Sequence, residues 1–419
     1  MKLRKKEIVT TPFDRHVEPP RQNLFFMPLI WAFSWLATRN GKLKIHRERM
    51  KGLKPPFLVL GTHHAFMDFY ITPLALFPYR GNYVSELEGF ENFGEWLYRQ
   101  AGCLGTRKFV SDIALVRNIK RVTDRGDILV LYPEARYANV GTSCEIPDSV
   151  GKLAKLLDVP LVTINMHGNY LQSPIWNLKR RRGVPLETTI TQQFTREELS
   201  KASVEEVNAQ IRQALSYDEY AWQYDKKISI DVPWRSEGLE LVLYKCPECG
   251  AEFQMKTRGA QLYCGGCGAL WTMGELGRME SSGNAAEMFE HIPHWYDWQA
   301  AQVRCEIDED RYVFDMQVRI QSLPNAANFI DLGAGYLRHN KEGFHLRFTE
   351  YGETKEKTLL FSAASMLSVH TEYDYRGKGQ CITLSTLNNT YFVYPVEPGF
   401  NATKIQFATE YFHHLAENA

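Results

Sequence analysis

The chain has 419 residues, of which 44% are apolar and 23% charged, a composition typical of globular proteins rather than disordered or fibrous ones. Its 49 basic and 49 acidic residues cancel, which excludes a uniformly basic nucleic-acid coat and an acidic tail protein. At roughly 100–200 residues per domain, this length predicts two to four domains.

The N-terminal segment, residues 1–56, is basic although the whole chain is neutral. It contains 13 Lys and Arg against 4 Asp and Glu, a net charge of +9. Within it, the stretch Leu24–Ala37 is apolar and rich in Phe and Trp, but too short to span a membrane and not placed as a secretory signal. Aromatic residues beside a basic flank predict a helix or helix pair that lies in a membrane interface. A buried N-terminal helix is the alternative.

Residues 57–237 have the pattern of an α/β domain. Compact apolar runs predict buried strands over 57–61, 128–132 and 160–164. Helices are expected over 112–125 and 149–157, so that the strands form a mostly parallel sheet. A polar helix is expected over 197–222, followed by a short strand over 228–232 that stops at Pro233.

The composition changes after Glu237. Residues 240–277 form a short module rich in Gly and Cys. Residues 300–417 then alternate polar and apolar positions between turn signals, which predicts antiparallel hairpins, and they end in an amphipathic helix over Ala402–Leu415. This β-rich domain closed by a helix resembles a pleckstrin-homology-like domain, which implies lipid or protein recognition, or packing alone.

The strongest catalytic pattern is the segment from Gly61 to Asp68. His63 follows the first predicted strand, and Asp68 lies five positions later. If His63 lies in the turn after the strand, Asp68 in the first helical turn reaches back to one ring nitrogen and leaves the other facing the ligand edge of the sheet. An imidazole held in one tautomer by a carboxylate is a general base. A structural histidine is the alternative.

Three further blocks follow in a set order. They are Gly105-Thr106-Arg107, Tyr132-Pro133-Glu134-Ala135-Arg136 and Val159-Pro160-Leu161-Val162. Together with His63-x4-Asp68, these blocks resemble those of the glycerophospholipid acyltransferases, the family that includes lysophosphatidic acid acyltransferase. The resemblance covers about residues 20–220.

The resemblance implies transfer of an acyl chain from acyl-CoA or acyl carrier protein to a hydroxyl of a lysophospholipid or glycerol phosphate, in phospholipid biosynthesis. His63 would deprotonate the acceptor and Asp68 would orient the imidazole, with no catalytic metal. Thr106, Arg107, Glu134 and Arg136 would bind the acceptor and its phosphate. The protein would lie on the cytoplasmic face of a membrane, peripheral or monotopic.

The third block departs from the family pattern, Phe-Pro-Glu-Gly-Thr-Arg. Ala135 replaces its Gly, and Arg136 comes one position early, with Tyr137 in the usual place of the Arg. Thr62 precedes His63 where the family usually has Asn. These departures affect the block expected to bind the acceptor, so the altered block could equally indicate a different acceptor. An ion pair between Glu134 and Arg136 is the alternative. The basic run 179–182 is a second candidate for phosphate or membrane contact, or a solvated charge run.

Four of the eight cysteines form two close pairs. Cys246-x2-Cys249 and Cys264-x2-Cys267 are separated by 14 residues and surrounded by glycines. Four thiolates suit tetrahedral zinc with no open position, hence a structural site in a fold that resembles a zinc ribbon. Two disulfides or an iron–sulfur site are the alternatives.

Two other functions remain open beside the acyltransferase. One is a catalytically silent lipid-binding scaffold that keeps the fold, and the other is a zinc-ribbon protein that binds a partner. No basic stripe lies beyond the N-terminus, so nucleic acid is not an expected partner.

Overall fold

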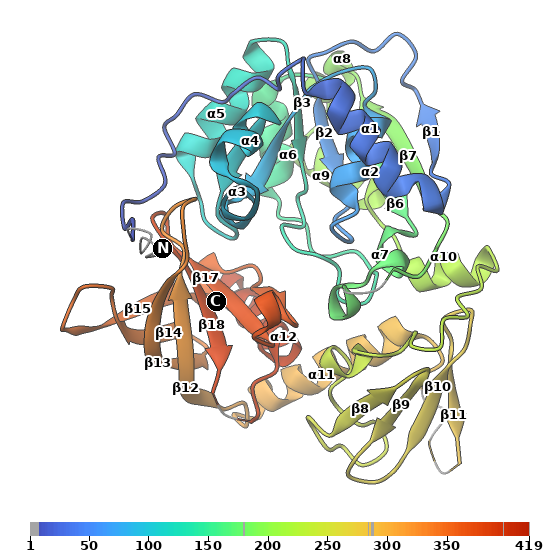
Figure 1. Ribbon diagram of the computed structural model, residues 1–419, viewed down its shortest axis with the longest axis vertical. Helices are drawn as coiled ribbons and strands as arrows, with labels where there is room; N and C mark the ends of the chain where they lie inside the picture. Colours follow the sequence, from blue (N-terminus) through green and yellow to red (C-terminus); the bar gives the residue numbers. More distant parts are fainter. Residues whose placement is uncertain (1–7, 179–180, 284, 286–288, 397, 419) are drawn as a thin grey trace, which may run out of the picture. The chain divides into compact units, whose positions relative to one another are not determined.

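The computed structural model describes the chain except for residues 1–7, 179–180, 284, 286–288, 397 and 419 (Figure 1). The chain divides into two compact units. Unit 1 consists of Met1–Asn23, Tyr83–Arg121 and Glu306–Ala419, and unit 2 of Leu24–Asn82 and Val122–Cys305. Each unit therefore combines segments distant in sequence. The four domains expected over 1–56, 57–237, 240–277 and 300–417 stay a prediction.

Five strands of unit 2 lie side by side in the order β1-β7-β6-β2-β5. They are β1 (Lys44–Glu48), β2 (Leu58–Gly61), β5 (Ile128–Leu131), β6 (Leu161–His167) and β7 (Glu187–Phe194). Strand β2 pairs in parallel with β5 and β6, while β7 is antiparallel to β6. The three predicted strands are confirmed, and every residue of β2 is buried, as expected for a central strand.

The helices of unit 2 include α2 (Asp68–Ala75), α6 (Ser149–Leu157), α7 (Asn169–Gln172), α8 (Arg196–Lys201), α9 (Val204–Ala214) and α10 (Glu219–Asp225). The helix α5 (Ile113–Asp124), which ends in this unit, and α6 agree with the prediction. The single helix expected over 197–222 is wrong, because Ala202 is extended and Ser203 begins α9 with a capping box to Glu206. The strand expected over 228–232 is also wrong, since those residues form no strand.

Helix α1 (Met27–Thr38) has an unusual distribution of side chains. It buries Ser34 and Thr38, and the Thr38 hydroxyl donates to the Ser34 carbonyl at 2.8 Å. Its apolar residues Leu29, Phe33 and Leu36 are exposed. No helix in the described part of the chain combines the length and apolarity that a membrane crossing requires.

The Cys-rich module is a four-stranded antiparallel sheet in the order β11-β10-β9-β8. Its strands are β8 (Met255–Arg258), β9 (Gln261–Cys264), β10 (Leu270–Met273) and β11 (Met279–Ser282), and α11 (Ile292–Asp308) lies beside them (Figure 1). Trp295 of α11 packs on Trp271 of β10 with ring centroids 4.9 Å apart. This module belongs to unit 2, together with the α/β sheet.

Unit 1 contains a parallel pair, β3 (Gly81–Glu86, which begins in unit 2) and β4 (Cys103–Thr106), with α3 (Leu87–Phe93) and α4 (Glu95–Gln100) between them. Its larger sheet is antiparallel, in the order β15-β14-β13-β12-β18-β17-β16. These strands are β12 (Phe314–Ser322), β13 (Ile330–Asn340), β14 (Gly343–Thr349), β15 (Glu356–Ser362), β16 (His370–Glu372), β17 (Cys381–Ser385) and β18 (Thr390–Pro395). The chain ends in α12 (Ala402–Glu417), so the expected hairpins and closing helix are confirmed.

Short 3-10 turns lie between these elements, at Arg39–Gly41, Ile175–Asn177, Leu239–Leu241, Ala363–Ser365 and Tyr375–Gly377.

Candidate functional site

The structure brings His63 and Asp68 together at the carboxyl end of β2. His63 lies in the turn after the strand, and Asp68 is the first residue of α2. The His63 Nδ1 lies 3.0 Å from Asp68 Oδ2. The same oxygen accepts the backbone N–H of His64 at 2.8 Å and that of Ala65 at 3.2 Å. These hydrogen bonds hold the turn, so the spacing of five residues is what allows the contact.

Asp68 is fully buried, and its surroundings determine the tautomer of His63. Burial raises the pKa of the Asp68 carboxyl, while the hydrogen bond from His63 opposes that shift. As a carboxylate, Asp68 accepts only, so His63 carries its proton on Nδ1 and keeps the Nε2 lone pair. The His63 side chain remains 7% exposed. Its Nε2 is not used in the contact with Asp68 and keeps the lone pair that a general base needs.

Asn169 is a third member of this cluster, and no sequence block indicated it. Its side-chain amide donates a hydrogen bond to Asp68 Oδ1. Asn169 lies two residues beyond the end of β6, the strand that pairs in parallel with β2. Carboxyl ends of neighbouring parallel strands meet at one edge, so a polar residue just after β6 was the signal that could have indicated it.

Two tyrosines enclose the His63 ring. Tyr132 stacks on it with centroids 4.7 Å apart, and Tyr137 lies on it at 4.5 Å. Gly61 makes room for Tyr132, since a Cβ at that position would lie 2.8 Å from the Tyr132 ring. Tyr137 occupies the position where the family pattern has Arg, so an aromatic ring contacts the imidazole there.

Glu134 is buried, and both of its carboxylate oxygens accept hydrogen bonds from other residues of the protein. Its Oε1 accepts the backbone N–H of His63 at 3.3 Å. Its Oε2 accepts the backbone N–H of Cys144 at 3.0 Å and the hydroxyl of Tyr217 at 2.9 Å. Burial raises the pKa of Glu134, and the hydrogen bonds from Cys144 and Tyr217 oppose the shift. These contacts position the backbone at His63, and the acceptor-binding role of Glu134 stays a prediction.

The neighbours of Glu134 explain part of the altered block. Ala135 has a φ of 56°, the left-handed conformation that the Gly of the family pattern would adopt without strain. Arg136 is buried, with 7% of its surface accessible, so it is not a solvated surface charge.

Arg107 makes structural contacts inside unit 1. Its guanidinium donates to the carbonyls of Leu323 at 2.8 Å and Pro324 at 2.7 Å, and to the Thr390 hydroxyl at 2.7 Å. Burial lowers the pKa of Arg107 to about 10, so it remains charged at neutral pH. Thr106, the last residue of β4, belongs to the same unit. The contacts of Arg107 join β4 to the C-terminal sheet, and a role in binding phosphate stays a prediction.

A second imidazole–carboxylate pair lies at the end of β6. His167 Nδ1 lies 2.8 Å from Glu219 Oε1, and the His167 ring stacks on Trp222. His64 is fully buried nearby, with its ring 3.7 Å from that of Tyr217. Burial holds the pKa of His64 well below its usual value, and repulsion from His167 and His63 in their protonated forms adds to this shift, so the His64 ring is neutral.

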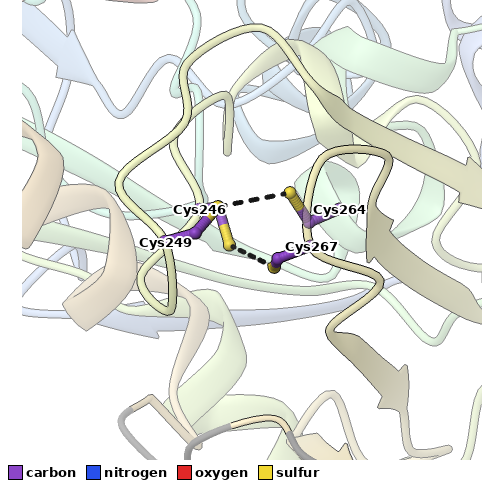
Figure 2. Close-up of side chains that lie close together, drawn as sticks. All are labelled: Cys246, Cys249, Cys264 and Cys267. Carbon is purple, nitrogen blue, oxygen red and sulfur yellow. Dashed lines mark hydrogen bonds between the residues drawn. The ribbon is translucent and has the colours of Figure 1, made fainter.

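The four cysteines of the Cys-rich module form one cluster. Figure 2 shows their side chains converging from the two Cys-x2-Cys turns. The Sγ atoms of Cys246 and Cys267 lie 3.8 Å apart, as do those of Cys249 and Cys264. All four sulfurs lie within 4.8 Å of one another. A disulfide needs sulfurs about 2.05 Å apart, so these contacts are not disulfides.

The spacing of the sulfurs fits a metal ion. A tetrahedral site with metal–sulfur bonds of about 2.3 Å has sulfur–sulfur edges of about 3.8 Å. The cluster is the single group of three or more metal-ligating residues found in the described residues. Its four ligands would fill a tetrahedral site, which leaves no position for a substrate.

Comparison with known proteins adds little. No protein-family model matches the chain, and no curated protein does. A solved structure that it resembles is the 1-acyl-sn-glycerophosphate (LPA) acyltransferase PlsC from Thermotoga maritima, with 17% identity over 45% of this chain and 77% of that chain. The TM-score is 0.37, which is too low to carry any inference about function.

Replacing Arg107 tests its structural role. Arg107→Met removes the donors to three buried acceptors, and we expect the free energy of unfolding to fall by about 2–4 kcal/mol. Urea unfolding measures this change. Arg117→Met, at an exposed position of α5 in the same unit, is the matched control and is expected to change stability by less than about 0.5 kcal/mol. Equal stability of the two variants would contradict the structural role.

Metal analysis tests the cysteine cluster. We expect one tetrahedral metal ion per chain, measured by mass spectrometry of the metals in purified protein, and its loss in Cys264→Ser. Cys305→Ser changes an exposed cysteine outside the cluster and should keep the full metal content. Undiminished metal in Cys264→Ser would show that this cluster does not bind the ion.

Proposed function

We propose that this protein is an acyltransferase that moves an acyl chain from a thioester, on CoA or acyl carrier protein, to a hydroxyl of a lysophospholipid or glycerol phosphate. The observation that carries the proposal is the 3.0 Å contact of His63 Nδ1 with the buried Asp68 carboxylate. This contact leaves Nε2 as a proton acceptor at the carboxyl edge of a parallel sheet, where such sheets place ligands.

The proposed reaction needs only this pair and the two substrates. His63 Nε2 takes the proton of the acceptor hydroxyl as the oxygen attacks the thioester carbonyl. The new ester C–O bond forms, the C–S bond breaks, and the imidazolium returns the proton to the leaving thiolate. Asp68 stabilises the imidazolium between these steps. Tyr132 and Tyr137 keep the ring in one orientation.

The exposed side of α1 supports contact with a membrane surface. Leu29, Phe33 and Leu36 recur at the spacing of one helix face and are exposed, while the helix buries Ser34 and Thr38. A soluble helix has the reverse distribution. Exposed Phe25, just before α1, has 91% of its surface accessible. Burying these side chains in lipid would remove a large apolar surface from water.

This apolar surface continues to the catalytic turn. Phe33 contacts Tyr70, Tyr70 contacts Phe66, and Phe66 contacts Phe69, with ring centroids 5.5 to 5.7 Å apart. Phe69 in turn meets the His63 ring edge-on at 5.9 Å. A lipid acceptor bound at this surface would therefore lie close to His63.

Basic residues lie beside the same surface. Arg181 donates a hydrogen bond to the carbonyl of Ala37 in the last turn of α1. Burial raises the pKa of the Tyr70 hydroxyl, and the positive charge of Arg181 opposes that shift. Arg181 belongs to the predicted basic run 179–182, of which 179–180 lie outside the described residues. Cations next to exposed aromatic rings favour anionic phospholipid. We therefore place the protein on the cytoplasmic face of a membrane, as a peripheral or monotopic protein.

The remaining parts complete the proposal. Zinc is the ion that suits four thiolates with a structural role. The two antiparallel meanders β12–β15 and β16–β18, joined through β12 and β18 and closed by α12, support a pleckstrin-homology-like domain.

Loss of the base tests the activity directly. We expect His63→Ala to lower the rate of acyl transfer from acyl-CoA or acyl carrier protein to lysophospholipid by at least about 10³-fold, because no other group takes the acceptor proton. Thioester consumption measures the rate. His46→Ala, at an exposed histidine of β1, is the control and should keep the wild-type rate. If the protein is a catalytically silent scaffold, the wild type will show no turnover, and neither will the two variants.

Vesicle sedimentation tests the membrane contact. We expect Phe25→Ser combined with Phe33→Ser to weaken binding to vesicles that contain phosphatidylglycerol by about tenfold or more, since each buried Phe contributes about 1.5–3 kcal/mol. Binding should also weaken as salt rises. Phe253→Ser, at an exposed Phe of the Cys-rich module, should bind as the wild type does. Equal binding of all variants would place the contact elsewhere.

A further inference from the structure

Three consecutive residues at the start of α10 contact three different parts of unit 2. Tyr217, Asp218 and Glu219 bind, in this order, the loop that carries Glu134, the Cys-rich module with α11, and the end of β6. None of them belongs to the sequence blocks that indicated catalysis. The Tyr217 contact leads to His63 through one further residue, Glu134, and the Glu219 contact leads to Asp68 through two, Gly168 and Asn169.

Tyr217 is connected to His63 through Glu134. Its hydroxyl donates to Glu134 Oε2 at 2.9 Å, and Glu134 Oε1 accepts the backbone N–H of His63. Backbone and side-chain hydrogen bonds with Ser143 hold Tyr217 against the same loop. Tyr217 therefore fixes the carboxylate that holds the backbone of the base.

Glu219 is connected to Asp68 through Gly168 and Asn169. Its Oε2 accepts the backbone N–H of Gly168 at 2.7 Å, and its own N–H donates to the Gly141 carbonyl. Gly168 directly precedes Asn169, whose amide donates to Asp68. A Cβ at Gly168 would lie 2.0 Å from the Pro185 carbonyl oxygen, so this backbone has little freedom to shift. Glu219 thus fixes the peptide from which Asn169 reaches Asp68.

Asp218, between them, is tied to the Cys-rich module. Its Oδ1 caps α10 at the N–H of Ala221, and its Oδ2 accepts from His291 Nε2 at 2.7 Å. Arg278 donates to His291 Nδ1 at 3.0 Å and lies 4.3 Å from the ring of Tyr224 in α10. Arg278 directly precedes β11 in the sheet whose strand β9 ends at Cys264. The contacts are therefore continuous from the cysteine module to both supports of the catalytic pair.

We propose that Tyr217 and Glu219 are positioning residues for the His63–Asp68 pair, and that the cysteine module acts on this pair through Arg278, His291 and Asp218. The inference rests on the proposed acyltransferase function. It gives the module a role in the reaction although its own ligands leave no open position. Loss of the ion would weaken catalysis because the segment 217–219 would lose its outer support.

The first experiment replaces the Tyr217 hydroxyl. We expect Tyr217→Phe to lower kcat about tenfold with KM unchanged, because the ring still packs on His64 while Glu134 loses one donor. Tyr220→Phe removes a buried hydroxyl three residues further along the chain, in α10, that makes no hydrogen bond to Glu134, and it should keep the wild-type kcat. A kcat of Tyr217→Phe equal to that of Tyr220→Phe would overturn the positioning role.

The second experiment tests the connection to the module. We expect Arg278→Met to lower kcat about fivefold in the wild type and by less in Tyr217→Phe, since the part of its effect that passes through Tyr217 is already lost in that background. Equal losses in the two backgrounds would overturn the connection.

Hydrogen exchange of the His63 amide separates this inference from the proposed function. The N–H that donates to Glu134 should exchange faster in Tyr217→Phe and in Arg278→Met, and at the wild-type rate in Tyr220→Phe. If the wild type transfers no acyl chain, the proposed function fails, and the exchange rates alone decide whether the segment holds His63. Unchanged exchange in both variants would overturn the inference.

Discussion

The burial of the Asp68 carboxylate is the constraint on which the rest of the site depends. A buried ion is costly unless donors surround it, and this one receives N–H groups from His64, Ala65, Asn169 and the His63 ring. To supply these donors, strand β2 ends at Gly61, the following turn points its backbone amides toward the carboxylate, and α2 begins at Asp68 itself. The same donors leave His63 with one possible tautomer, so a requirement of stability also prepares a general base.

The groups that hold this pair come from separate elements. Glu134 follows β5, Asn169 follows β6, and Tyr217 and Glu219 lie at the start of α10. Parallel strands bring the first two to one edge of the sheet, and α10 connects them from outside. Contacts therefore continue from the base to the Cys-rich module, and the α/β sheet and this module belong to one compact unit.

Local patterns predicted the parts of the structure that local chemistry determines. The apolar runs located β2, β5 and β6, and the spacing of His63 and Asp68 indicated their contact. Capping by Ser203 divided the helix expected over 197–222, because a capping box outweighs a continuous polar pattern. Asn169 and Tyr217 were not predicted, since their roles depend on which distant strand and helix lie beside the turn. Arg107 matched a sequence block, yet its donors are occupied by carbonyls that only the fold brings to it.

The most direct test of this account is the protonation state of the His63 ring in the resting protein. A nitrogen–proton correlation spectrum of the imidazoles near neutral pH, with His63 assigned by its replacement, reports which ring nitrogen carries hydrogen. We expect hydrogen on Nδ1 and a bare Nε2. Hydrogen on Nε2 would contradict the account, because that nitrogen could not then accept the proton of an alcohol.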